Sequence, residues 1–178
     1  MKIKAILLPT LALLMICVVV TAALSFTNRL TKDTIAQQNQ QKITQTMELL
    51  VPGATFEQVN DTTYIATQNG TVTYVFLTQA MGYKSKVEVM TAIDQNGTVL
   101  GVSVVNCSEE SPGIGQKVGT DQDFLNGFQG KTDDIDGVDG ITGATYSANA
   151  VKEAVKEALT LFHALNTVTP TSLAGGAQ

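Results

Sequence analysis

An uncharged apolar run over residues 5–26 is the feature that most limits what this chain can fold into. The run reads AILLPTLALLMICVVVTAALSF, and Thr10, Thr21 and Ser25 carry its only hydroxyl groups. At about 1.5 Å of rise per residue, a helix of this length crosses the hydrocarbon core of a bilayer, which is about 30 Å thick. We therefore expect residues 1–26 to form an N-terminal transmembrane anchor.

A cleaved signal peptide is the competing interpretation of the same run. Lys2 and Lys4 form a short basic start, and Thr21-Ala22-Ala23 offers small residues of the kind found at cleavage sites. The apolar core of a signal peptide usually has about 7–15 residues, and this run is longer. The length therefore favours an anchor that stays attached.

The distribution of charge predicts on which side of the membrane the rest of the chain lies. The chain has 11 Lys and Arg against 16 Asp and Glu, and Lys2 and Lys4 precede the apolar run. The acidic remainder is repelled by anionic headgroups and by nucleic-acid phosphates. We expect no nucleic-acid partner, a cytoplasmic N-terminus at the inner or plasma membrane, and residues 27–178 on the extracytoplasmic side.

The sequence after the anchor predicts a helical stalk followed by an antiparallel sheet. Residues 28–50 contain no Gly or Pro, and Pro52-Gly53 ends this stalk, which we assign to residues 27–53. Runs rich in β-branched and aromatic residues follow at 63–68, 71–78, 85–93 and 99–105. Asn69-Gly70 and Asn96-Gly97 lie between these runs and supply the positive φ angles of tight turns, so two hairpins are expected.

The end of the chain predicts one more helix. Apolar residues recur at three- and four-residue spacing from residue 147 to about residue 166, which is typical of an amphipathic helix packed on a sheet. The expected fold class is α+β: an antiparallel sheet with a packed C-terminal amphipathic helix, preceded by the transmembrane helix and the stalk helix. Residues 54–168 are expected to form the single globular domain, and 169–178 a disordered tail.

The chain has few of the residues that usually bind metals or perform catalysis. It contains two cysteines, Cys17 and Cys107, and one histidine, His163. A disulfide framework, a zinc cage, an iron–sulfur cluster or a Ser–His or Cys–His catalytic set needs more of them. We therefore expect no catalytic residue and no metal site.

Two glycine-containing loops are the candidate functional segments. EESPGIG over residues 109–115 is either a surface turn or part of a site. It matches a dinucleotide-binding fingerprint only in part, because Val118 occupies the place of the third glycine. DGVDGITGATYS over residues 136–147 runs into the last helix, where small residues and free amides suit an anion such as phosphate. Ser147 is the expected N-cap of that helix. From the residues alone, this second loop is either a turn with a cap or a phosphate site.

The second loop resembles the D-x-x-[ST]-G-A-T flavinylation motif of FMN-binding domains, through DGITGAT over residues 139–145. Such domains occur in the G subunit of the Rnf electron-transport complex and in the C subunit of the sodium-pumping NADH:quinone reductase. ESPGIG over residues 110–115 is similar to a second motif of the family, which lies near the flavin ring. The short length and the single anchor look more like the Rnf protein, and the resemblance covers nearly the whole chain.

The resemblance implies a cofactor, partners and a set of site residues. FMN would be bound covalently through a phosphoester to the threonine at position 145, installed by a dedicated flavin transferase, with the amides of residues 142–147 around the phosphate. Other membrane subunits of the complex are the implied partners. The implied cofactor-binding residues are Thr145, Thr142, Gly143, Ala144, Ser147, Glu110, Ser111, Gly113, Ile114 and Gly115.

The function implied by the resemblance is that of a redox subunit, not catalytic alone, in an ion-translocating ferredoxin:NAD-type oxidoreductase complex. One alternative is an FMN domain that serves another extracytoplasmic electron chain. A second alternative is a non-catalytic anchored binding or sensor domain, whose glycine-rich loop is only a turn. Flavin that stays on the denatured protein distinguishes this last alternative from the other two.

Overall fold

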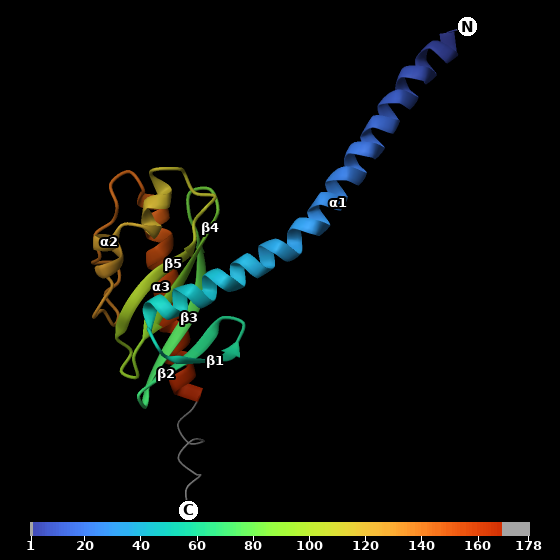
Figure 1. Cartoon of the computed structure of the whole chain (residues 1–178). Helices are drawn as coiled ribbons and strands as arrows, with labels where there is room; N and C mark the ends of the chain where they lie inside the picture. The colour runs from blue at the N-terminus through green and yellow to red at the C-terminus, as the bar shows by residue number, and fades with distance from the viewer. Residues whose placement is uncertain (1, 169–178) are drawn as a thin grey trace, which may run out of the picture. The chain divides into compact units, whose positions relative to one another are not determined.

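The computed structural model describes residues 2–168, without the side chains of residues 2–8, 29, 30, 32–36 and 168. The tail expected at 169–178 lies outside the described residues. The elements in chain order (Figure 1) are α1 (Lys2–Leu50), β1 (Thr55–Asn60), β2 (Thr63–Gln68), β3 (Thr71–Met81), β4 (Lys86–Ile93), β5 (Val99–Asn106), the 3-10 helix η1 (Gly115–Gly119), α2 (Gln122–Asn126) and α3 (Thr145–Val168).

The first helix, α1, is continuous, so the anchor and the stalk expected from the sequence are parts of one element. It ends at Leu50, just before the predicted stop signal. There the amide of Gly53 donates to Oε1 of Glu48 at 2.9 Å, and Gly53 has a φ of 73°. Within α1, the segment Pro9–Asn28 has a mean hydropathy of 2.3, and by length and composition it is able to cross a membrane.

The contacts within the chain separate residues 1–42 from a compact unit that begins at Ile43. The last turns of α1 therefore belong to the compact unit. The side chains of Ile43 and Met47 are buried and pack with Val51 against the sheet. The end of the stalk is thus part of the folded core, in addition to the spacer role that its sequence indicates.

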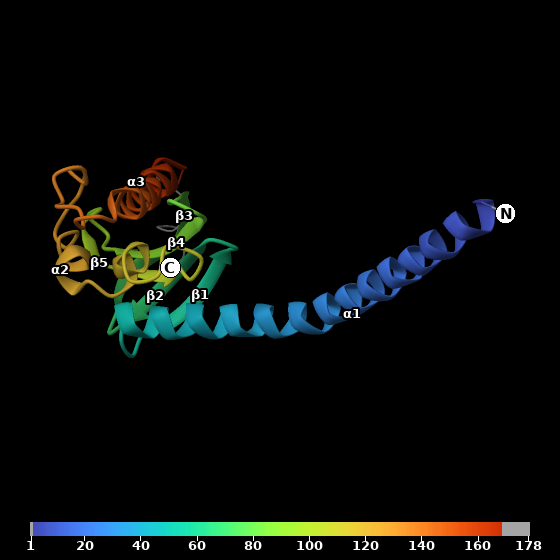
Figure 2. The ribbon, with the colours of Figure 1, turned by 90° about the horizontal axis from the view of Figure 1, so that it is seen from above.

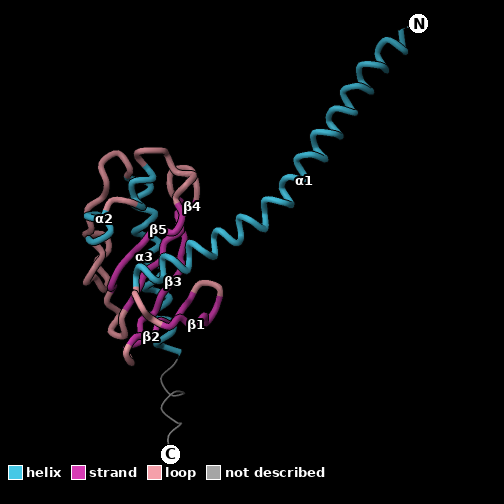
Figure 3. The backbone as a smooth tube through the Cα atoms, in the orientation of Figure 1, coloured by secondary structure: helices cyan, strands magenta, loops and turns pink. Residues whose placement is uncertain are grey.

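The sheet is an antiparallel meander of five strands in the order β1-β2-β3-β4-β5 (Figure 3). Both predicted hairpins are confirmed. Asn69 and Gly70, with φ of 51° and 82°, form the turn between β2 and β3, and Gly97, with φ of 87°, lies in the turn between β4 and β5. The edge strand β1 is not predicted from the sequence, because its side chains are almost all exposed and show no apolar alternation.

The two faces of the sheet carry separate cores. Figure 2 shows that α3 covers one face and the end of α1 covers the other. Successive side chains of a strand point to opposite faces. In β4, Val87 and Val89 therefore point toward the core that contains α3, while Met90 and Ala92 point toward the core that contains the end of α1. The α+β class predicted from the sequence is confirmed.

The last helix, α3, packs along the sheet through a face made mostly of small residues. Ala150, Ala154 and Ala158 are all buried to 1% exposure or less, so the helix backbone comes close to the strands. The hydroxyl of Thr78 on β3 donates to the carbonyl of Ala154 at 2.9 Å. This hydrogen bond and the alanine face fix where the N-terminus of α3 lies.

Candidate functional site

The two loops singled out in the sequence meet beside the N-terminus of α3. A cavity of about 380 Å³ lies between them. Its lining includes six of the ten cofactor-binding residues expected from the sequence, which come from the loop after β5 and from the start of α3. The lining residues are Tyr83, Ser111, Ile114, Gly115, Gly143, Ala144, Tyr146 and Ser147.

Glu110 joins the three segments that surround this cavity. Its side chain is 1% exposed. Oε1 accepts hydrogen bonds from the amides of Lys84 and Ser85, both at 3.0 Å, and Oε2 accepts one from the amide of Tyr83 at 3.1 Å. The hydroxyl of Ser147 donates to the same Oε2 at 2.5 Å. The carboxylate therefore holds the β3–β4 turn, the loop after β5 and the first turn of α3 together.

The environment of Glu110 favours its charged form. Burial raises the pKa of the carboxyl, but the hydrogen bonds from the Ser147 hydroxyl and from the amides of residues 83–85 lower it further than burial raises it. The net effect is a pKa below the ordinary value of a glutamate. Because donors hydrogen-bond the ionised form, Glu110 remains a carboxylate at neutral pH.

Two glycines leave the room that this arrangement needs. A Cβ atom at position 82 would lie 2.7 Å from Oε1 of Glu110, and one at position 115 would lie 2.9 Å from Oγ of Ser147. Both distances are shorter than real Cβ contacts. Gly82 and Gly115 are therefore required by the close packing around the carboxylate.

The glycines at positions 113 and 143 serve a different purpose. Their φ angles are 74° and 83°, in the left-handed region that side chains with a Cβ rarely adopt. A Cβ at Gly143 would lie 3.7 Å from Ile114, so this turn directly contacts the other loop. Gly113 has open space around it and does not line the cavity.

The start of α3 differs from the sequence-based expectation, and the prediction that Ser147 is the N-cap is wrong. The helix begins at Thr145, and the carbonyl of Ala144 accepts the first intrahelical hydrogen bond, from the amide of Ala148 at 2.9 Å. Ser147 lies within the first turn. Its hydroxyl donates to the buried Glu110 carboxylate, a charged acceptor that forms a strong hydrogen bond.

The first turn of α3 suits an anion. The amides of residues 145–147 lie in the first helical turn, where amides have no intrahelical acceptor, whereas the amide of Ala144 is already bonded to the carbonyl of Ile141 at 2.9 Å. The whole of this turn is described, and it carries no acidic residue. Thr145 is exposed here, and its chain neighbours Ala144 and Tyr146 both line the cavity.

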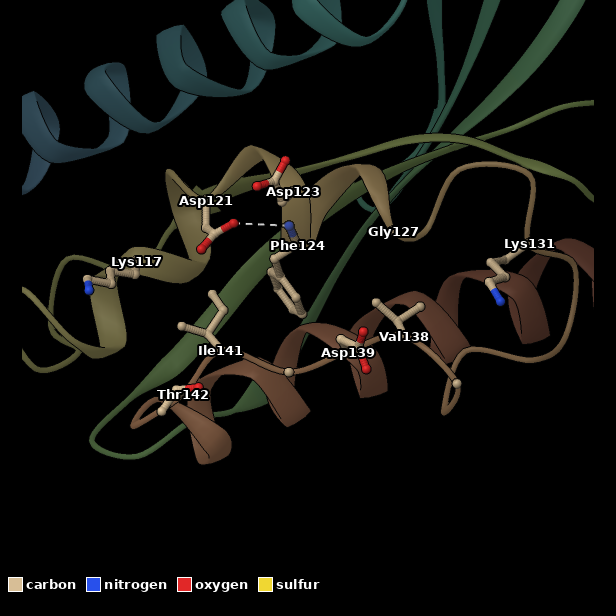
Figure 4. Close-up of a pocket in the computed structure, with 12 residues that line it drawn as sticks. Lys117, Asp121, Asp123, Phe124, Gly127, Lys131, Val138, Asp139, Ile141 and Thr142 are labelled. Carbon is tan, nitrogen blue, oxygen red and sulfur yellow. Dashed lines mark hydrogen bonds between the residues drawn. The ribbon is translucent and has the colours of Figure 1, made fainter.

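A second and larger cavity, of about 610 Å³, lies between α2 and residues 137–142 (Figure 4). Thr142 and Asp139 of the motif line it. Asp121 also lines it, and its carboxylate accepts from the amide of Phe124 at 3.0 Å and so caps α2. Its charged lining residues are Lys117, Asp121, Asp123, Lys131 and Asp139.

Two lysines on α3 hold the glycine-rich loop in place. The ammonium group of Lys152 donates to the carbonyls of Val138 and Asp136. Lys156 forms an ion pair with Asp136, with distances of 2.6 and 2.7 Å to its two carboxylate oxygens. The hydrogen bond and the charge of Lys156 lower the pKa of the exposed Asp136 carboxyl. Sequence reasoning missed this contact, although the spacing of the lysines by four residues places them on one helix face.

Sequence reasoning also missed Tyr83 and Tyr146, which border the cavity. Their ring centroids lie 6.2 Å apart, with 42° between the planes. Tyr146 directly follows the motif in the sequence, and this position could have identified it as a candidate site residue. Tyr83 lies in the β3–β4 turn, far from both loops in sequence, and only the fold brings it to the site.

Comparison with known proteins identifies two family models in the chain. The FMN-binding domain model matches residues 82–160, which include both loops and most of α3. The model of the RnfG N-terminal region matches residues 1–49, which correspond to α1. Together these matches cover the anchor, most of the stalk and both candidate loops.

Similar curated proteins are G subunits. The G subunit of the ion-translocating oxidoreductase complex of Vibrio vulnificus is 29% identical over 168 residues, covering 76% of this chain and 79% of that protein. The G subunit of the proton-translocating ferredoxin:NAD(+) oxidoreductase complex of Clostridium ljungdahlii is 31% identical over 144 residues, covering 73% of this chain and 77% of that protein.

Solved structures share the fold. The C subunit of the Na(+)-translocating NADH-quinone reductase of Parabacteroides distasonis superposes with a TM-score of 0.50 and 21% identity, covering 62% of this chain and 63% of that one. NqrC of Shewanella oneidensis gives a TM-score of 0.50 and 22% identity, covering 59% and 60%. Less than two thirds of either solved chain is therefore matched. With the G subunits matched over more than three quarters of their length and the FMN-binding model spanning the cavity, the chain belongs to the family of G subunits of ion-translocating Rnf oxidoreductase complexes.

Proposed function

We propose that this chain is a membrane-anchored electron-transfer subunit that carries covalently bound FMN in an ion-translocating ferredoxin:NAD-type oxidoreductase complex. The observation that carries the proposal is the meeting of the 110–115 loop and the 139–145 motif at one cavity, beside a helix N-terminus. The FMN-binding model and the G-subunit relatives support it.

The residues around the cavity fit a flavin mononucleotide. The free amides of residues 145–147 favour a phosphate next to Thr145. The hydroxyl of this exposed threonine would form the phosphoester. Ser147 is a poor alternative because its hydroxyl is buried and already donates to Glu110.

Within this site, the chain's own residues hold and orient the cofactor. FMN, when bound, supplies the uptake and release of electrons. Glu110 fixes the positions of the three segments around the ring, and the Lys152 and Lys156 contacts fix the loop that bears the motif. The other proposed cofactor-binding residues that line the cavity are Ser111, Ile114, Gly115, Gly143 and Ala144. For the two remaining residues we propose an indirect part: Gly113 sets the turn of the 110–115 loop, and Thr142 belongs to the motif where it borders the larger cavity.

The membrane part of the proposal depends on α1. Its segment Pro9–Asn28 is apolar, and its side chains are exposed along the whole segment, as lipid-facing side chains are. Lys2 and Lys4 before it favour a cytoplasmic N-terminus, with the FMN domain outside. We further propose the boundaries 1–26, 27–53 and 54–168 for anchor, stalk and domain, with other complex subunits and a flavin transferase as partners.

Fluorescence of the denatured protein in a gel tests the proposal. The full chain, co-expressed with a flavin transferase, is expected to give a fluorescent band under ultraviolet light, because covalent flavin survives denaturation. The Thr145→Ala variant is expected to give a dark band at an equal amount of folded protein. Thr160→Ala, a matched change on the exposed side of α3, is expected to stay fluorescent. A dark band for the unchanged chain would contradict the proposal.

A further inference from the structure

Three large exposed side chains of the compact unit lie around the same cavity. Tyr83 is 62% exposed, Ile114 is 51% exposed and Tyr146 is 70% exposed. They come from the β3–β4 turn, from the loop after β5 and from the first turn of α3. Single exposed apolar side chains are ordinary, but a group that three distant segments bring to one cavity marks a binding surface.

The backbones that carry the two tyrosines are fixed by one carboxylate. The amide of Tyr83 donates to Oε2 of Glu110 at 3.1 Å. Tyr146 directly precedes Ser147, whose hydroxyl donates to the same oxygen. The ring centroids lie 6.2 Å apart, and both side chains are mostly exposed. Because the two backbones are already fixed, less entropy is lost when a flat ligand binds to the rings.

We propose that Tyr83 and Tyr146 form the aromatic wall of the FMN site and bind the isoalloxazine ring in the 380 Å³ cavity. This inference rests on the proposed function and names residues that neither family motif contains. A flat aromatic ring gains from stacking on tyrosine faces. The cavity volume is within the range of small-molecule sites, and Ala144 and Tyr146, on either side of the attachment residue, both line it.

The larger cavity is the less suitable place for the ring. Five charged side chains line it, and two of them are lysines. The oxidised isoalloxazine ring has no charge, so it would cover these charged side chains without neutralising them. The experiment below also detects whether the ring binds in the larger cavity instead.

Flavin fluorescence in the folded full chain tests the inference. The chain has no Trp, so tyrosines are its strongest aromatic quenchers of flavin emission. The covalently loaded protein, in detergent, is titrated with iodide, which quenches only a ring that it can reach. For Tyr83→Leu and Tyr146→Leu we expect flavin emission to rise and the iodide quenching constant to increase about threefold, as expected for loss of one stacking contact.

The conservative variants separate stacking from other effects. Tyr83→Phe and Tyr146→Phe keep the ring area but lose the electron-rich phenol, so emission is expected to rise while protection from iodide stays. Lys131→Gln, at the far end of the larger cavity, is expected to change neither reading. Unchanged iodide quenching in both leucine variants would overturn the inference, and a change with Lys131→Gln alone would place the ring in the larger cavity and overturn it as well.

A second arm makes the result independent of covalent attachment. Free FMN is titrated into the Thr145→Ala chain with and without the leucine substitutions, and the Kd is expected to rise about threefold for each tyrosine replaced. A dark gel band for the unchanged chain refutes the proposed covalent function, whereas this arm still tests the wall. If neither arm responds to the tyrosine variants, the aromatic wall is refuted while a fluorescent band leaves the proposed function standing.

Discussion

At the scale of single residues, the Glu110 carboxylate is the group on which the geometry of the site depends. It receives four hydrogen bonds from two other segments, the β3–β4 turn and the first turn of α3, while its side chain is almost fully buried. Replacing it by glutamine would put an amide NH₂ group against backbone donors. Such a loss of paired acceptors typically costs about 1–3 kcal/mol.

The lowered pKa of Glu110 gives a prediction about pH. Because the folded pKa lies below the unfolded value of about 4.3, the stabilisation is present above that value and is lost as pH falls through the folded pKa. We expect the free energy of unfolding, measured with urea between pH 7 and pH 3, to fall in the acid range. Glu110→Gln is expected to flatten part of that fall.

Glu109→Gln is the matched control, because Glu109 is the exposed neighbour of Glu110. We expect its unfolding curve to follow that of the unchanged chain at every pH. An equal acid dependence in the Glu110→Gln variant and the unchanged chain would show that the carboxylate is not ionised in this network.

Ser147 gives a second prediction at this scale. If its hydroxyl only capped the helix, Ser147→Ala would cost about 1 kcal/mol regardless of Glu110. Because the hydroxyl donates to a buried carboxylate, we expect a loss of about 2 kcal/mol in urea unfolding, with covalent FMN retained. In a double-mutant cycle with Glu110→Gln, the two losses are expected to be clearly non-additive. Additive losses would favour the capping role.

At the scale of elements, the loop after β5 contains two glycines with different physical roles. Gly113 adopts a positive φ in open space, while Gly115 makes room for Ser147 and Glu110. Added methyl groups therefore act differently at the two positions. At Gly113 the added methyl group contacts nothing but strains the backbone, whereas at Gly115 it collides with the packed atoms of Ser147 and Glu110.

These roles predict different results for alanine at the two positions. Gly113→Ala is expected to cost about 1 kcal/mol from strain, with little change in the flavin absorption spectrum. Gly115→Ala is expected to cost up to about 3 kcal/mol from overpacking and to shift the spectrum, because this residue lines the cavity. Unfolding curves and spectra of the loaded chain measure both effects. Equal spectral changes in the two variants would contradict the assignment.

At the scale of the whole molecule, the sequence predicts those parts of the fold that depend on local residue patterns. Asn69-Gly70 specified a hairpin turn, and the regular apolar spacing specified α3. The resemblance to FMN-binding domains implied that both loops belong to one site, and in the structure they meet at one cavity. The four hydrogen bonds to Glu110 were not predictable, because three donors are backbone amides, which every residue except proline has.

Other features depend on tertiary context. β1 forms as an edge strand without an apolar face, so its pattern resembles that of a loop. Ala144 takes the N-cap position of α3 in place of Ser147, three residues earlier than expected, because the turn between Ile141 and Ala144 leads directly into the helix. The burial of Met47 depends on a sheet that the stalk sequence does not contain.

The orientation across the membrane is a prediction for the whole chain. With Lys2 and Lys4 inside and the acidic domain outside, protease added to spheroplasts is expected to digest residues beyond the anchor. A cytoplasmic marker protein in the same sample is the control and should remain intact. Digestion that occurs only after the membrane is broken would show the reverse orientation.

Peptide mass spectrometry of the unmutated, flavin-loaded chain is the most direct test of covalent FMN at Thr145. One peptide contains Thr142, Thr145 and Ser147, and fragmentation between these residues locates the added mass. We expect the FMN mass on Thr145, because its hydroxyl is exposed beside the free amides of α3. FMN mass on Thr142 or on Ser147, or a peptide without added mass, would contradict this assignment.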